Sequence, residues 1–215
     1  TGGGLGVAAD AYVGDDIYLI SDSAVLGFGA DSEIKFTHVA DTGLNLKHTA
    51  TADDKPIILT LQTGETDIAA DDIIGTINFQ APDEGTGTDA ILVAAGIEAV
   101  SEGDFSSSSN ATKLSFKTGA SEAASEKVAI SSAGNLSLTA SNTELRFYEG
   151  SNYVGFEAPA LSGDQIWVLP DSDGSNGQVL KTDGSGNLSF AAQSVSSIAA
   201  DDISAGDAAV TIGNG

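Results

Sequence analysis

Short runs in which apolar and polar side chains alternate recur along most of the chain. Residues 34–37 read Ile-Lys-Phe-Thr and residues 113–118 read Lys-Leu-Ser-Phe-Lys-Thr. Alternation over several residues is typical of a β-strand with one covered face and one face in water. The predicted strands cover residues 34–39, 44–48, 57–63, 74–79, 113–118, 128–130, 136–138, 145–148, 152–156, 165–169, 178–182 and 187–191.

Turn-forming residues separate these runs and leave little room for helices. Gly, Pro, Asp and Asn stand between the runs, as in residues 41–43, which is typical of tight turns between strands. Residues 90–102 are small and apolar enough for a helix, yet the central Gly96 and the β-branched residues near both ends favour a buried strand. One helical turn is expected at residues 122–126. The sequence therefore predicts an all-β fold of short strands and tight turns.

Large side chains are scarce, which narrows the kind of all-β protein this can be. The chain holds 8 Phe, 4 Tyr, 1 Trp and no Met, so much of its 41% hydrophobic fraction is Ala. Small residues suit narrow layers in which backbones approach closely better than they suit a broad globular interior. We therefore expect an elongated, repetitive or oligomeric architecture of β-sandwich, β-prism or β-helical modules.

The charge balance excludes two classes of partner. The chain carries 8 Lys and Arg against 31 Asp and Glu, a formal net charge of -23, which repels a phosphate backbone and an anionic membrane alike. No apolar run approaches the roughly 20 residues that span a bilayer. There is also no Cys for disulfides or thiolate metal sites. We expect no nucleic-acid partner and no membrane insertion.

Two short sequences recur and indicate a modular chain. Residues 68–73 and 198–203 both read Ile-Ala-Ala-Asp-Asp-Ile, and Gly-Asn-Leu-Ser precedes a large apolar residue at 134–138 and again at 186–190. The two spacings differ, so they establish no repeat of fixed period. The expected modules are a Gly-led N-terminal β module (1–50), a second β module (51–140), an aromatic-rich β module (141–193) and a truncated further repeat (194–215).

Residues 74–138 combine several motifs in a fixed order. The motifs are Gly-Thr-Ile-Asn-Phe (75–79), Ala-Ile-Leu-Val-Ala-Ala-Gly-Ile-Glu-Ala (90–99), Thr-Lys-Leu-Ser-Phe-Lys-Thr (112–118) and Glu-Lys-Val-Ala-Ile-Ser-Ser-Ala-Gly-Asn-Leu (126–136). In order and residue type this segment resembles a module common in bacteriophage tail fibres, and residues 169–190 also look like fibre-associated sequence. Residues 1–50 resemble acidic fibre proteins of marine phages more loosely. The segment departs from the commonest form at residues 127–130, which read Lys-Val-Ala-Ile where a Met-containing strand is usual.

The resemblance implies a parallel homotrimer of β-structure, located in the virion and outside the cell. Its implied partners are copies of itself, other virion tail proteins and a host cell-surface glycan or protein. The implied role is structural and not enzymatic, because such a segment projects a host-attachment element. A bacterial extracellular filament or adhesin subunit is the alternative, and a polysaccharide-binding or depolymerising tailspike domain is the second alternative. In a trimer, three narrow β-layers share one axial core, which explains how few large side chains suffice.

The Asp-rich residues 171–177 are the best metal candidate in the sequence. Asp171, Asp173 and Asn176 place carboxylate and amide oxygens on one loop, and such oxygens suit Ca2+. The loop fails the EF-hand pattern, because its sixth position is Asn176 instead of Gly and its twelfth is Thr182 instead of Glu. The same residue types also form tight turns. We expect a structural turn and no cofactor, with Ca2+ binding as the alternative.

Large side chains concentrate in residues 145–169. Aromatic clusters bind sugars in some proteins, but in a chain with so few large residues we expect them to form the main core or the packing between chains. The inter-chain packing candidates are Phe147, Tyr148, Tyr153, Phe156, Trp167 and Leu169.

Three further patterns have simpler interpretations than a site. His38 and His48 are the only imidazoles and lack a third ligand at suitable spacing, so no zinc site is expected. The pair Asp71-Asp72, repeated at residues 201–202, resembles paired catalytic carboxylates. Adjacent strand residues point to opposite faces, however, so we favour a role in capping a turn or keeping an edge soluble. Residues 2–6 lack the Lys-Ser/Thr ending of a phosphate-binding loop.

Overall fold

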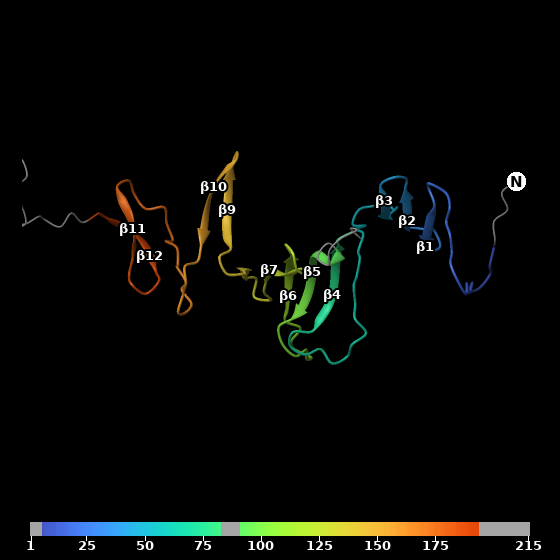
Figure 1. The fold of residues 1–215 in the computed structure, drawn as a ribbon, viewed down its shortest axis with the longest axis horizontal. Helices are drawn as coiled ribbons and strands as arrows, with labels where there is room; N and C mark the ends of the chain where they lie inside the picture. Colours follow the sequence, from blue (N-terminus) through green and yellow to red (C-terminus); the bar gives the residue numbers. More distant parts are fainter. Residues whose placement is uncertain (1–5, 83–90, 194–215) are drawn as a thin grey trace, which may run out of the picture. The chain divides into compact units, whose positions relative to one another are not determined.

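The computed structural model describes residues 6–82 and 91–193, and these residues contain β-strands and no α-helix. The strands pair antiparallel into four small open sheets, drawn as groups of arrows in Figure 1. The predicted all-β class is confirmed. Internal contacts divide the chain into two compact units, Thr1–Thr139 and Ala140–Gly215. The finer division into four modules stays a prediction.

The first sheet contains β1 (Val25–Phe28), β2 (Ile34–Val39) and β3 (Gly43–His48), in that order. The turn between β2 and β3 is closed by the Thr42 N–H, which donates to the Val39 carbonyl at 3.0 Å. Asp41 adopts a φ of 56°, a left-handed conformation that short Asp side chains tolerate. The Asp-Thr-Gly sequence therefore forms the turn that its composition predicts.

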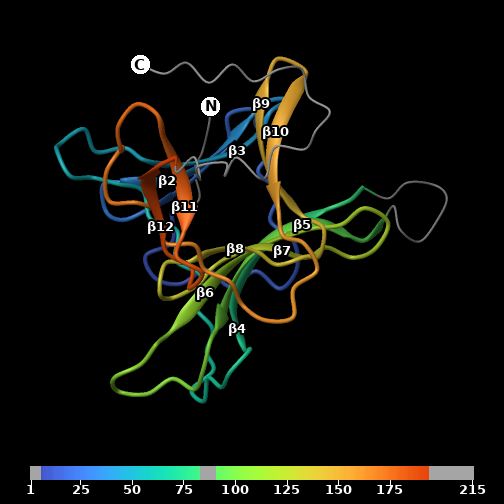
Figure 2. The ribbon, with the colours of Figure 1, turned by 90° about the vertical axis from the view of Figure 1, so that its left-hand side faces the viewer.

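The second sheet is a five-stranded meander whose spatial order follows the chain. Its strands are β4 (Ile73–Gln80), β5 (Val93–Ser101), β6 (Thr112–Thr118), β7 (Ser125–Ile130) and β8 (Leu136–Leu138), seen in Figure 2. β5 confirms that residues 90–102 contribute a strand and not a helix. Each strand pairs with the next one in sequence, so β4 and β8 form the two edges of the sheet.

The second unit contains two separate hairpins. β9 (Glu144–Glu149) pairs with β10 (Asn152–Glu157), and β11 (Gln178–Thr182) pairs with β12 (Leu188–Ala192). Gly150 adopts a φ of 60° between β9 and β10, a conformation that glycine takes without strain. Next to β12, Val168 makes an isolated parallel bridge with Asn187. Its N–H donates to the Gly186 carbonyl at 2.9 Å, and its carbonyl accepts from the Leu188 N–H at 2.8 Å.

The repeated Gly-Asn-Leu-Ser sequence forms the same kind of turn twice. The Ser131 N–H donates to the Asn135 carbonyl at 3.0 Å, and the Asp183 N–H donates to the Asn187 carbonyl at 3.1 Å. In return, Ser131 Oγ accepts from the Asn135 N–H and Asp183 Oδ1 accepts from the Asn187 N–H, each at 3.1 Å. Each copy of the repeated sequence therefore forms a turn that leads directly into a strand, β8 (Leu136–Leu138) or β12 (Leu188–Ala192). The second Ile-Ala-Ala-Asp-Asp-Ile copy lies outside the described residues.

Three local predictions are wrong. Residues 57–63 and 165–169 are not strands, although their β-type runs between turn residues predict strands. A suitable run of residues is not sufficient, because a strand also needs a neighbour for its backbone hydrogen bonds. Residues 165–169 obtain only the bridge at Val168. Residues 122–126 form no helical turn, because β7 begins at Ser125 and pairs with β6.

Candidate functional site

One face of the five-stranded sheet is lined with apolar side chains. The register places one apolar residue from each strand in a continuous row across the sheet. That row consists of Ile77, Ile97, Phe116, Val128 and Leu138. A second row, with Gly75 at its β4 end, continues through Ala99, Leu114, Ile130 and Leu136. We call these two rows the apolar sheet face.

Much of the apolar sheet face is exposed to solvent in the single chain. Ile77 at one edge is 45% exposed and Leu136 at the other is 65% exposed. Leu61 provides local cover, because its Cβ lies 3.3 Å from the position that a Cβ of Gly75 would occupy. Exposed apolar side chains that lie next to one another in this way are typical of interaction surfaces.

The opposite face of the same sheet is polar and is closed by its own side chains. Ser115 and Ala129 are paired across β6 and β7 and are both buried. Lys117 Nζ lies 2.6 Å from Glu98 Oε1, and Lys113 Nζ lies 3.0 Å from Glu126 Oε2. Among the described residues the buried apolar side chains are only Val100 and Ala129. The single chain thus covers the polar face of this sheet better than the apolar one.

Hydrogen bonding on this polar face also affects the pKa of Glu126. Partial burial of the carboxylate tends to raise its pKa, but hydrogen bonds from Lys113 and Ser115 and the Lys113 charge outweigh burial and lower it. The carboxylate is thereby stabilised in its charged form. The charged groups of Glu126 and Lys113 on the polar face are thus paired with each other within the chain.

The Asp71-Asp72 pair lies in a turn that precedes β4. Asp72 Oδ2 accepts from the Ala69 N–H at 2.7 Å, and the Asp72 N–H donates to Ser101 Oγ at 3.0 Å. Ser101 is fully buried and its hydroxyl also donates to the Ala69 carbonyl. Asp71 adopts a φ of 68°. Asp72 therefore caps a turn, as its sequence context predicts.

The hairpin of β9 and β10 also separates its side chains into an apolar face and a polar face. Leu145, Phe147, Val154 and Phe156 share one face by register. Phe147 and Phe156 meet edge to face with 6.3 Å between ring centroids, yet they are 53% and 70% exposed. An isolated two-stranded hairpin is marginal in water and needs a further partner for stability.

The side chains on the polar face of this hairpin contact one another. Arg146 makes an ion pair with Glu144 at 2.7 Å and places its guanidinium 4.4 Å from the centroid of the Tyr153 ring. Tyr148 and Tyr153 lie across the hairpin from each other with ring centroids 5.3 Å apart. The hydrogen bond from Arg146 lowers the pKa of Glu144, and the reciprocal bond raises the pKa of Arg146. The candidate aromatics thus fall on two faces with different chemistry.

Trp167 and Leu169 flank the bridge at Val168 and belong to no strand. Trp167 is 59% exposed, and Leu169 is exposed as well. All six predicted packing candidates therefore lie at the surface of the single chain and contribute no core to it. Whether another chain covers them stays a prediction.

The first sheet carries a third apolar face. Leu26, Phe36, His38 and Leu44 line a hollow of about 310 Å3 together with Leu19 and Ala24. His38 pairs with Leu44 at one end of the β2–β3 ladder, and His48 pairs with Ile34 at the other end. The two imidazoles are therefore on one face but separated by the length of the ladder, and the structure does not bring them together.

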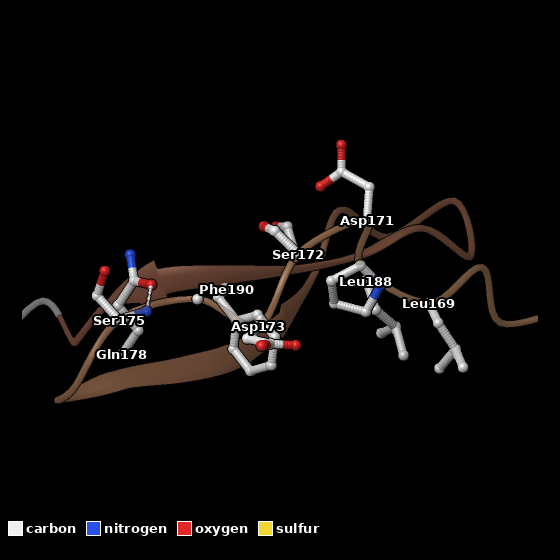
Figure 3. Close-up of a pocket in the computed structure, with 11 residues that line it drawn as sticks. Leu169, Asp171, Ser172, Asp173, Ser175, Gln178, Leu188 and Phe190 are labelled. Atoms are coloured by element: carbon white, nitrogen blue, oxygen red, sulfur yellow. Dashed lines mark hydrogen bonds between the residues drawn. The ribbon is translucent and has the colours of Figure 1, made fainter.

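The Asp-rich loop lies beside β12 and lines a hollow of about 550 Å3 (Figure 3). Gly174 rests against the Phe190 ring, since a Cβ at this glycine would lie 2.6 Å from Phe190 Cγ. The Ser175 N–H donates to Gln178 Oε1 at 2.6 Å and closes the loop. In Figure 3 the carboxylates of Asp171 and Asp173 point in different directions. The loop thus has the internal contacts of a turn.

Among residues 6–82 and 91–193, no group of three or more His, Cys, Asp or Glu side chains is placed to hold a metal ion. Nor does this described part contain a helix that is long and apolar enough to cross a membrane. The Asp171, Asp173 and Asn176 oxygens remain the metal candidates from the sequence.

The sequence reasoning missed the two apolar rows and the ion pair of Glu98 with Lys117. The rows have a signal in the sequence, because they are the apolar half of each alternating run. Their alignment depends on register, and the bulges between Phe79 and Gln80 and between Phe116 and Lys117 alter that register locally. Neither bulge has a clear signature in the sequence.

Comparison of the chain with protein-family models, with curated proteins and with solved structures finds no match.

Proposed function

We propose that this chain is a structural segment of a bacteriophage tail fibre, assembled as an elongated homotrimer that projects a host-attachment element. The proposal rests on the sequence resemblance for the virion and on the structure's exposed apolar faces for the assembly. One observation carries the proposed assembly. Much of the apolar sheet face is exposed to solvent, whereas side chains on the polar face of the same sheet are buried or joined in ion pairs.

The apolar faces favour copies of this chain as the partner. The first sheet, the five-stranded sheet and the β9–β10 hairpin each have one apolar face. In a parallel homotrimer the same face of each copy meets its counterparts about the symmetry axis, so each sheet gains an apolar core. Burial of such faces contributes roughly 25 cal/mol per Å2 of apolar surface.

The net charge of -23 affects the assembly as well as the choice of partner. Bringing three acidic chains together costs electrostatic repulsion, which falls as salt screens the charges. The apolar faces contain few acidic residues, so the carboxylates can stay in water outside the axis. A fibre of this kind remains soluble because its outer surface is strongly charged.

The location in a virion is tested by labelling. An antibody raised against the purified chain should decorate fibres on phage particles in negative-stain electron microscopy, with pre-immune serum as the control. Decoration of filaments on bacterial cells, with unlabelled particles, would instead identify an extracellular filament or adhesin subunit. Release of reducing sugars from host polysaccharide by the purified chain would identify a depolymerising domain and contradict a purely structural role.

A further inference from the structure

Asn176 and Gly177 occupy the middle of the turn that leads into β11. Residues 175–178 form this turn, since the Gln178 N–H donates to the Ser175 carbonyl at 3.1 Å. Gly177, at the third position, has a φ of 83°, which is the conformation that a type II turn requires there. Asn176 and Gly177 are both exposed to solvent. The Asn-Gly pair therefore lies on a surface turn that water can reach.

The carboxamide of Asn176 and the N–H of Gly177 are both free to move. Among the described residues, neither group has a hydrogen-bond partner within the chain. A Cβ at Gly177 would have no other part of the protein within 4 Å, so the space beside this peptide is open. Glycine takes φ values of either sign, so the peptide between the two residues can rotate at little cost. Such a rotation can bring the Gly177 nitrogen against Cγ of Asn176.

Asn187, at the other end of β11, is held in the way that Asn176 is not. Its Nδ2 donates to Asp183 Oδ2 at 2.7 Å, and its N–H donates to Asp183 Oδ1 at 3.1 Å. The next residue is Leu188, whose N–H donates to the Val168 carbonyl at 2.8 Å. Attack by the Leu188 nitrogen on the Asn187 carboxamide would break these hydrogen bonds and would also be hindered by the leucine side chain. The two asparagines that flank β11 therefore differ in reactivity.

We propose that Asn176 is a site of spontaneous deamidation through a cyclic succinimide. The Gly177 nitrogen loses its proton and attacks Cγ of Asn176. The Cγ–Nδ2 bond breaks, and Nδ2 takes up the proton and leaves as ammonia. One water molecule then opens the ring at either carbonyl, which gives aspartate or isoaspartate. Solvent water is the co-reactant, and nothing is oxidised or reduced.

Isoaspartate changes the turn because its main chain runs through the former side chain and is longer by one carbon. Two hydrogen bonds span this position. The Gln178 N–H donates to the Ser175 carbonyl at 3.1 Å, and the Ser175 N–H donates to Gln178 Oε1 at 2.6 Å. Gln178 begins β11 and pairs with Ala192 on β12. Deamidation therefore loosens the start of this hairpin. The reaction occurs within one chain, so it is independent of the proposed homotrimer and of the virion location.

Incubation of the purified full-length chain at mildly alkaline pH tests the proposal, because the attacking nitrogen must lose a proton. Trypsin cleavage after Arg146 and Lys181 yields the peptides 147–181 and 182–215. Fragmentation of the first peptide should show that Asn176 has exchanged one ammonia for one water and is present as aspartate and isoaspartate. Asn187, in the second peptide, should stay unmodified. The Gln178 amide should exchange hydrogen faster in the isoaspartate form.

Gly177→Ala is the matched variant, because the added methyl group has room in the fold but hinders the attack and restricts the rotation. Its Asn176 should react several-fold more slowly than that of the wild-type chain. A synthetic peptide of residues 171–181 supplies the rate without the fold. A wild-type chain whose Asn176 is intact when half of this peptide has reacted would overturn the proposal. Equal rates at Asn176 and Asn187 would contradict it as well.

Discussion

Leu114 and Ser115 are neighbours on β6, yet the leucine is 39% exposed and the serine is 1% exposed. Leu114 belongs to the apolar sheet face, whereas Ser115 lies on the polar face between the two lysine–glutamate ion pairs. A sheet that is complete within one chain buries its apolar face and leaves the polar face in water. The reverse distribution in this sheet is the basis for expecting a further copy of the chain.

The β9–β10 hairpin permits a comparison between its two faces. Phe147→Ser removes a ring from the apolar face, and if other chains bury that ring the assembly should lose about 3 kcal/mol per chain. Tyr148→Ser is the matched control on the polar face, where the ring pairs with Tyr153 within the hairpin. It should cost only about 1 kcal/mol.

The measurement for this pair is thermal unfolding at several protein concentrations together with sedimentation velocity. Phe147→Ser should shift the population toward single chains, and Tyr148→Ser should not. Equal effects on association from both variants would contradict the assignment of the faces.

Alanine substitutions at two glycines of the Asp-rich loop distinguish the cost of backbone strain from the cost of a packing clash. Gly174 and Gly177 have φ values of 72° and 83°, so alanine at either position costs about 1 kcal/mol from the backbone alone. Only Gly174 has a neighbour in the way, the Phe190 ring. Gly174→Ala should therefore lower the melting temperature more than Gly177→Ala. Equal melting temperatures would show that the loop does not rest on Phe190.

The Asp183 turn should open in acid. A hydrogen bond from the Asn187 side chain and those from the backbone N–H groups of Ser185 and Asn187 lower the pKa of Asp183. The folded pKa lies below the unfolded value of about 3.9, so this stabilisation is complete above that value and disappears as the pH falls through the folded pKa. Hydrogen-exchange protection of the two backbone amides should decrease accordingly.

Asp183→Ala is the reference for that experiment. It should show weak protection of the Ser185 and Asn187 amides at every pH. Wild-type protection that persists unchanged at about pH 2 would mean that the carboxylate does not hold the turn.

Calcium should leave the stability of the chain unchanged. The carboxylates of Asp171 and Asp173 point in different directions, whereas Ca2+ needs six to eight oxygens about 2.4 Å from one centre. Melting temperatures in chelator and in millimolar Ca2+ should therefore agree. A rise of several degrees with Ca2+, lost in Asp171→Asn or Asp173→Asn, would establish a metal site in this loop.

Most strands are predictable from the sequence, because alternation and turn residues are local signals. Residues 34–39 and 178–182 coincide with β2 and β11. Residues 57–63 show the limit of such signals, since they read Ile-Ile-Leu-Thr-Leu-Gln-Thr and still form no strand. Strand formation also depends on a pairing partner, and the residue pattern of one segment does not identify that partner.

The candidate surfaces are less predictable than the strands. The aromatic residues near 145–156 attract attention by their size, but register decides that Phe147 joins Phe156 while Tyr148 joins Tyr153. The ion pair of Glu98 with Lys117 depends on how β5 and β6 align in the sheet. Relationships between strands of this kind arise from hydrogen-bonded pairing and have no counterpart in the spacing of residues along the chain.

Sedimentation equilibrium of the purified chain is the most direct test of the homotrimer. The open apolar faces predict a species of three times the 21.5 kDa chain mass at micromolar concentration, with salt present to screen the acidic surface. A folded species of 21.5 kDa that persists as the concentration rises would contradict the account.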